Sequence, residues 1–146
     1  MTARVPASVA SFVQAQEVLV LQQYTAPDGT VSVGWGHRVV PSDNLPPTIT
    51  EAVAQSLLEA DVTYAMNCVL GLVTVALTPG QLTALTDFVF NVGCQAFTMS
   101  QFPATLALSD FGKAAVLFLH YVTHANSIGI AGTPGRRLAE QGVFLT

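Results

Sequence analysis

Residues 17–37, EVLVLQQYTAPDGTVSVGWGH, constrain the fold of this chain more than any other stretch. Pro27-Asp28-Gly29 is typical of a tight turn, because proline fixes φ and glycine adopts the conformations that a turn needs. The run after it alternates polar and apolar side chains, as a strand does. Trp35 then stands between two glycines, and His37 follows the second of them. Because a lone acid, Glu17, precedes this hairpin, the stretch predicts a carboxyl group directed into a cleft.

Composition narrows the class of protein. The chain has 146 residues, which is enough for one domain over residues 1–146 with a sizeable core. Hydrophobic residues make up 51% and charged residues only 10%, where about a quarter is usual, so the chain is not a disordered tail. The net charge is −4, with a single lysine, Lys113. Because a nucleic-acid-binding protein needs a basic patch, this balance predicts no nucleic-acid partner.

The run Val62–Leu77 carries no formal charge and raises the question of a membrane span. It is shorter than the roughly 20 apolar residues that a span needs. It also contains Asn67 and ends at Pro79-Gly80, so we expect a buried core helix and no membrane span. The first residues, MTARVPASVASF, have no long apolar core, and we expect no secretory signal.

Cysteines and histidines give no sign of a metal site. Cys68 and Cys94 are too few for a disulfide framework, and we interpret them as two buried free thiols. His37, His120 and His124 do not cluster with them at zinc-finger spacing. His120 and His124 lie four residues apart and are interpreted as one surface of a helix. We therefore expect no metal and no cofactor.

Hydrophobic periodicity and chain breakers predict a small hairpin lobe followed by a mainly helical lobe, an α+β arrangement. Thr50, Thr78 and Asp110 are the expected N-caps of helices. The expected elements are a helix over 7–24, strands over 30–33 and 35–40, a loop over 41–47, a helix from 50 through 61, a long apolar helix ending before Pro79, a helix starting at Pro79, helices at about 101–109 and 111–125, a loop over 129–135 and a short helix over 136–144.

The order of motifs resembles the phage-type lysozymes, the endolysin muramidases. In that family a Glu is followed at fixed spacing by Asp or Cys, by Thr and by Gly-Tyr-Gly-His, and here the same spacing holds Glu17, Ala26 and Ser32. Phe90-Asn91-Val92-Gly93 is typical of the family, and residues 135–144 resemble its closing Arg-Arg pattern. The resemblance implies a lysozyme-like fold of two lobes with a saccharide cleft between them. It also implies a peptidoglycan substrate, cut at the β-1,4 bond between N-acetylmuramic acid and N-acetylglucosamine.

The resemblance also assigns roles in catalysis. Glu17 stands at the position of the general acid, in apolar sequence surroundings that favour its neutral form. Ala26 stands where the family has its second carboxylate, and a methyl group can neither accept a proton nor orient a water. Asp28 is the nearest substitute, but we interpret it as a local turn residue that faces solvent. Ser32 keeps a hydroxyl that can hold a water.

Two further groups of residues match the family. His37 and Asp61 match a pair that ties the hairpin lobe to the following helix, a structural bridge. Arg136 or Arg137 could place a guanidinium beside the acid position. Alternatively, the two arginines form a helix-end pair with Glu140, and the two interpretations are compatible.

Three functions remain open from sequence. The first is an endolysin-type muramidase whose hydrolysis is impaired or lost, and the second is a non-catalytic structural subunit of a phage particle or another assembly. The third is a murein-binding module that does not hydrolyse. Only three formal charges fall between Val62 and Gly135, which predicts a protein partner on the helical lobe, around residues 101–125. The corresponding locations for a phage-encoded protein are the host cytoplasm or periplasm for an endolysin and the virion for a structural subunit.

Overall fold

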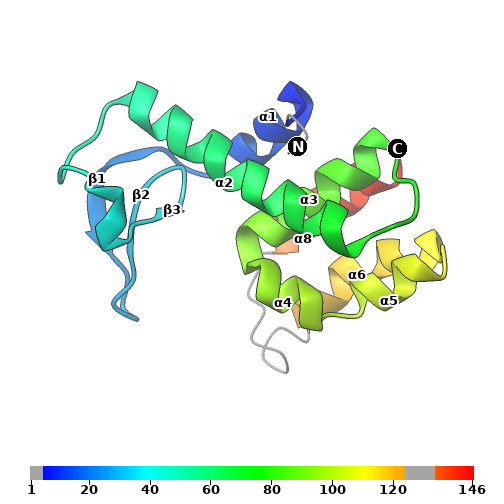
Figure 1. The fold of residues 1–146 in the computed structure, drawn as a ribbon. Coiled ribbons are helices and arrows are strands. Elements are labelled where there is room, and N and C mark those ends of the chain that lie inside the picture. The colour runs from blue at the N-terminus through cyan, green and yellow to red at the C-terminus, as the bar shows by residue number, and fades with distance from the viewer. Residues whose placement is uncertain (1–4, 124–133) are drawn as a thin grey trace.

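The computed structural model describes residues 5–123 and 134–146. Figure 1 shows a small sheet at one end of the molecule, most of the helices at the other end, and the long helix α2 running between them. The elements, in chain order, are α1 Ala7–Gln16, β1 Val20–Thr25, β2 Val31–Gly34, β3 His37–Arg38, the 3-10 helix η1 Pro41–Asp43, α2 Glu51–Leu72, α3 Pro79–Val92, α4 Cys94–Met99, α5 Phe102–Ala107, α6 Phe111–Thr123 and α8 Pro134–Phe144. The α+β fold predicted from sequence is therefore confirmed.

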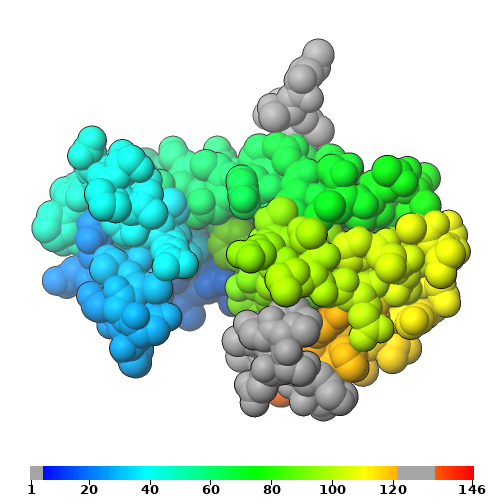
Figure 2. Space-filling view, turned by 60° about the horizontal axis from the view of Figure 1, so that its bottom comes forward, coloured from blue at the N-terminus to red at the C-terminus, as the bar shows by residue number. Residues whose placement is uncertain are grey.

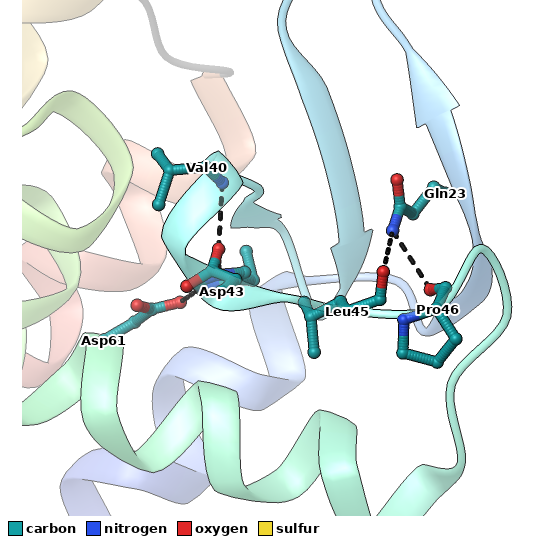
Figure 3. Close-up of polar contacts among 7 residues, drawn as sticks. Gln23, Val40, Asp43, Leu45, Pro46 and Asp61 are labelled. Carbon is teal, nitrogen blue, oxygen red and sulfur yellow. Dashed lines mark hydrogen bonds and ion pairs between the residues drawn. The ribbon is translucent and has the colours of Figure 1, made fainter.

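The sheet is antiparallel in the order β1-β2-β3. Tyr24 pairs with Ser32 and Val20 with Gly34 in the β1–β2 register. The loop before α2 covers the other edge of β1. There the side-chain amide of Gln23 donates to the carbonyl of Pro46 at 3.0 Å, as Figure 3 shows, and the backbone N–H of Gln23 donates to the carbonyl of Pro47 at 2.8 Å. This cover protects β1 from pairing with the edge of another chain.

The helix expected over 7–24 is wrong in its second half. The helix α1 ends at Gln16, and Glu17 is extended, with φ −113° and ψ 157°. The side chain of Val18 is 78% exposed, so a longer helix would bury little there. Pairing with β2 instead supplies partners for the backbone groups of Val20–Thr25. The third strand is also shorter than expected, His37–Arg38 instead of 35–40.

The two helices expected between residues 50 and 79 are a single helix, α2, of 22 residues. The N-cap prediction is confirmed, since the hydroxyl of Thr50 accepts from the N–H of Val53 at 3.2 Å. One helix is possible because no glycine or proline interrupts the run before Gly71. Its first half packs into the core under the hairpin and its second half into the core of the helical lobe. Within the described ranges, no helix is long and apolar enough to cross a membrane.

The helical lobe has a core of aromatic rings. Phe88 of α3 lies at its centre, with ring centroids of Phe102 at 4.9 Å and of Tyr121 at 5.7 Å. Two N-cap predictions are also confirmed in this lobe. Thr78 and Gln81 form a capping box at the start of α3, and the carboxylate of Asp110 accepts from the backbone N–H of Lys113 in α6. Helix α4 was not expected from sequence. The loop predicted over 129–135 and the residue His124 lie largely or wholly outside the described residues.

The expectation of two free thiols is wrong. Cys68 in α2 and Cys94 at the start of α4 form a disulfide across 26 residues of chain. The bridge forms because α2 lies against α3 and α4, which brings two distant positions together. It therefore ties the long connecting helix to the corner where α3 ends.

Removing this disulfide should destabilise the fold. Closing a loop of this length restricts the unfolded chain by about 3 kcal/mol, which corresponds to a fall in Tm of about 10 °C for a chain of this size. We expect this fall when thermal unfolding is followed by circular dichroism with and without a thiol reductant. The double variant Cys68→Ser/Cys94→Ser is the control and should melt at the lower temperature in both buffers. Equal melting of the reduced and oxidised protein would contradict the prediction.

Candidate functional site

Glu17 lies directly after the last turn of α1 and faces the C-terminal helix. Its carboxylate atom Oε1 accepts a hydrogen bond from Nη1 of Arg136 at 2.6 Å. The two residues are 119 positions apart in sequence. The side chain of Glu17 is 20% exposed, so the ion pair is partly shielded from water. The structure thus brings the predicted acid position and one of the two predicted arginines together.

Gly36 is the close neighbour of the other carboxylate oxygen. A Cβ atom at this position would lie 2.9 Å from Oε2 of Glu17, which is too short for any real contact. The backbone of Gly36 also has φ +75°, a conformation that side chains disfavour. Both facts favour glycine, because any other residue would strain the backbone and displace the end of the Glu17 side chain. The glycine-flanked motif therefore lets the hairpin approach the carboxylate closely.

Asp87 of α3 is the principal partner of Arg136. Its two oxygens accept from Nε at 2.9 Å and from Nη2 at 2.8 Å, a bidentate pair. Sequence reasoning missed Asp87, although its signal was present. It is one of three charged residues in a long apolar stretch, and an acid buried there needs a cation.

Arg137 points elsewhere than to Glu17. Its Nη2 donates to Asn91 at 2.7 Å, its Nε lies 3.0 Å from Glu140, and its guanidinium lies over the ring of Phe88 at 4.7 Å. The pairing with Glu140 that the sequence left open is therefore present in the structure. Arg137 is fully buried, so it belongs to the core of the helical lobe.

The hairpin turn carries Ala26 and Asp28. The N–H of Ala26 donates to the carbonyl of Thr30 at 2.8 Å, and its carbonyl accepts from Gly29 at 2.9 Å. One oxygen of Asp28 accepts from the hydroxyl of Thr30 at 2.7 Å and from its backbone N–H at 3.0 Å. These hydrogen bonds lower the pKa of the exposed Asp28 carboxyl. Asp28 thus stabilises the turn, and Ser32 lies half-buried in the following strand.

A hollow separates the two lobes. Figure 2 shows the surface indented between the hairpin lobe and the helical lobe. A cavity of about 310 Å³ lies here, with Gly36 and Arg38 on the hairpin side and Tyr64, Phe90 and Gly93 on the helical side. The position of Gly36 links this cavity to the carboxylate of Glu17. Residues of both lobes, including part of the predicted 90–93 motif, therefore line one space.

Both ring nitrogens of His37 have carboxylate partners, one in α2 and one in η1. Nδ1 lies 2.7 Å from Asp61 and Nε2 lies 3.0 Å from Asp43, whose same oxygen accepts from the N–H of Val40 at 2.9 Å. Figure 3 shows the side chain of Asp61 pointing from α2 toward Asp43. Asp43 was not expected from sequence. Its only signal was an acid six residues after the histidine, in a loop rich in chain breakers.

This geometry favours the doubly protonated imidazole, because only that form donates to both carboxylates. Burial by itself lowers the pKa of His37, but the hydrogen bonds to Asp43 and Asp61 outweigh burial and raise it. The pKa values of the two acids shift in opposite directions. Burial raises the pKa of Asp61, whereas the hydrogen bond from Val40 and then the one from His37 lower the pKa of Asp43.

No metal centre is seen in the described part of the chain. Across residues 5–123 and 134–146, no three His, Cys, Asp or Glu side chains are grouped so that they could hold a metal ion. Of the two histidines interpreted from sequence as one surface of a helix, His120 lies in α6, and His124 lies outside those ranges.

Comparisons with known proteins agree with the motifs of the sequence. The phage lysozyme family model matches residues 14–140. The endolysin of Salmonella phage P22 is 31% identical over 129 residues, which cover 86% of this chain and 87% of that protein. The solved structure of a mutant P22 lysozyme has a TM-score of 0.78 at 26% identity over 99% of both chains. The muramidase domain of SpmX from Asticaccaulis excentricus has a TM-score of 0.76 at 26% identity over 97% of both chains.

The bridge of His37 should make stability depend on pH. A raised folded pKa means that the stabilisation is complete below the unfolded value of about 6.5 and is lost as pH rises through the folded value. His37→Asn should therefore lower the free energy of unfolding more at about pH 5.5 than at about pH 8.5. Urea unfolding of the parent, His37→Asn, Asp61→Asn and the double variant gives the coupling between the two residues at each pH. A coupling that is equal at both pH values would refute the ionic bridge.

Gly36→Ala should distort the acid position. The positive φ costs about 1–2 kcal/mol for a non-glycine residue, and contact with the Glu17 carboxylate adds to this. Gly71→Ala is the matched control, because Gly71 lies in α2 with open space around it and should gain about 0.5–1 kcal/mol. Combining Gly36→Ala with Glu17→Ala should recover part of the loss measured by urea unfolding. No recovery would show that the carboxylate does not press on this glycine.

Proposed function

The chain belongs to the phage lysozyme family, and we propose that it is a murein-binding member whose hydrolytic step is impaired or lost. One observation carries the proposal. Within residues 17–36 only Glu17 and Asp28 carry carboxyl groups, and Asp28 is held by Thr30 at the tip of the turn. The position of the family's second carboxylate is occupied by the methyl group of Ala26. The cleft thus keeps an acid and lacks its partner.

Glu17 is suited to donate a proton to the glycosidic oxygen. Arg136 occupies Oε1, and Oε2 lies against Gly36, which lines the hollow between the lobes. A proton on Oε2 therefore faces the side where a glycan strand would lie. The bond in question is the β-1,4 link between N-acetylmuramic acid and N-acetylglucosamine of peptidoglycan.

The second half of the reaction has no equivalent group. Glycosidases that invert need a second carboxylate roughly 6.5–9.5 Å from the first, which removes a proton from the attacking water. The hydroxyl of Ser32 can hold a water by a hydrogen bond but is too weak a base to deprotonate it. Loss of the base typically costs about 10²- to 10⁴-fold in rate. Binding of the glycan needs no base, so it is retained in this proposal.

The disulfide supports a location outside the reducing cytoplasm. Disulfides persist in the periplasm and on particle surfaces and are rare where thiols are kept reduced. The bond between Cys68 and Cys94 therefore favours the host periplasm or a virion as the place where this phage-encoded protein acts.

A structural subunit is the second candidate, and exposed apolar side chains of the helical lobe support it. Leu108 is 82% exposed and Val116 is 61% exposed, both within the region 101–125 where sequence predicted a partner surface. Contact with another protein chain would remove these side chains from water, and each Å² of apolar surface buried stabilises the contact by about 25 cal/mol. Such a contact lies apart from the hairpin and leaves the cleft accessible.

Restoring the missing group should restore hydrolysis. Ala26→Asp should raise the release of reducing ends from purified murein by at least about 100-fold over the parent, because it supplies a general base. The double variant Ala26→Asp/Glu17→Gln should lose this gain. Cosedimentation with murein measures binding separately and should be similar for the parent and Ala26→Asp. A parent that hydrolyses as fast as Ala26→Asp would contradict the proposal, and Asp28→Asn would then show whether Asp28 acts as the base.

The second candidate predicts self-association or capture by a partner subunit. Sedimentation velocity of the isolated chain at micromolar concentration should show oligomers that Leu108→Glu/Val116→Glu dissociates, since burying a charge in an apolar contact is costly. Leu145→Glu, at an exposed apolar position near the C-terminus, is the control. A monomer under all conditions would count against an assembly of this chain with itself.

A further inference from the structure

Five charged groups meet at the base of the acid position, and the proposed reaction uses only one of them directly. They come from three elements: Glu17 after α1, Asp87 in α3, and Arg136, Arg137 and Glu140 in α8. Asp87, Arg137 and Glu140 are fully buried, and Arg136 is nearly so. Three acids face two arginines in this group. If all five were ionised, a net negative charge would be buried, which is strongly unfavourable.

Asp87 orients Arg136 toward Glu17. Two nitrogens of its planar guanidinium bind both oxygens of Asp87, and this fixes the plane in which Nη1 points to Glu17 at 2.6 Å. Burial lowers the pKa of Arg136, but the contacts with Asp87 and Glu17 raise it above its ordinary value, so the residue is a cation. Asp87 therefore both orients this cation and offsets its charge.

Glu140 lacks the partners that an ionised carboxylate needs. Nε of Arg137 lies 3.0 Å from Oε2, yet not in hydrogen-bonding geometry, and no N–H or O–H of the described residues donates to either oxygen of Glu140. Its hydrogen-bonding neighbour is the carboxyl of Asp87, and two carboxyl groups can share a hydrogen bond only when one of them is protonated. A buried carboxylate without donors costs several kcal/mol, whereas the protonated acid does not carry that charge. Burial raises the pKa of Glu140 and the nearby Asp87 raises it further, against the opposing charge of Arg137.

We propose that Asp87 is the positioning residue of Glu17 and that Glu140 carries one proton at neutral pH, so that the five groups together have no net charge while Glu17 is ionised. The two buried acids then differ in their effect. Asp87 offsets the charge of Arg136, and this makes it easier for the ionised Glu17 to take up the proton that it would donate to the substrate. Glu140, being protonated, adds no charge to the cluster. The catalytic meaning of this arrangement rests on the proposed role of Glu17, but the ionisation of the cluster does not.

Carboxyl-carbon NMR titration of the isotope-labelled protein tests the proposal. In the parent, the Glu140 signal should have the shift of a carboxylic acid at about pH 7. Asp87→Asn should move the titration midpoint of Glu17 to lower pH, because the arginine charge is no longer offset. Glu140→Gln, which resembles the protonated acid, should leave that midpoint in place. Glu59→Gln, at an exposed acid of α2, controls for the loss of one carboxylate.

Two results would overturn the proposal. One is an ionised Glu140 in the parent at neutral pH, and the other is a Glu17 midpoint that moves equally in Glu140→Gln and Asp87→Asn. If Asp87→Asn does not fold, the parent spectrum and Glu140→Gln still decide the charge state. None of these measurements uses hydrolysis. A failure of Ala26→Asp to gain activity would therefore count against the proposed function and leave this inference standing.

Discussion

The guanidinium of Arg136 joins elements from both ends of the chain, and the geometry of the acid position depends on it. It binds Asp87 of α3 with two nitrogens and Glu17 beyond α1 with a third. A buried cation is stable only with such partners, so the sequence must bring all three elements together. The aromatic core around Phe88 packs α8 against α3, and α1 also packs against α3. The ion pairs then determine where the carboxylate of Glu17 points.

The hairpin depends on this carboxylate in turn. Gly36 approaches Glu17 so closely that a side chain here would displace the carboxylate, and His37, the next residue, is tied to α2 through Asp61. Helix α2 continues into the second core, where Cys68 is bonded to Cys94. The lobes are thus connected at the acid position, by the histidine bridge and through one long helix. All three connections are present in a chain in which we propose that Ala26 stands in place of a second carboxylate, and they agree with a cleft kept for binding.

Local signals in the sequence were sufficient for part of this structure. Thr50, Thr78 and Asp110 cap helices by contacts within three residues, and such contacts can be read from the chain directly. The end of α1 could not be read in this way. Apolar residues keep a helical spacing through Val20 and Tyr24, and only pairing with β2 makes this segment a strand.

Some residues of the candidate site could likewise be predicted from the sequence, and others could not. Resemblance to a family indicated Glu17, His37, Asp61 and an arginine near the acid, and the structure places Glu17 in contact with Arg136 and His37 in contact with Asp61. It did not choose between Arg136 and Arg137, because one residue of offset on a helix changes the face. Asp43, Asp87 and the disulfide depend on contacts between distant segments, which spacing along the chain does not specify.

The central claim is that the cleft holds a glycan strand but does not cut it efficiently. Mass spectrometry of a defined murein oligosaccharide, incubated with the unaltered protein, measures both properties at once, since native spectra report the complex and denaturing spectra report the sugar. We predict a complex that contains the intact oligosaccharide, with almost no shorter fragments after a long incubation. Rapid appearance of fragments that end in N-acetylmuramic acid would contradict the account, and it would require another group to replace the missing carboxylate.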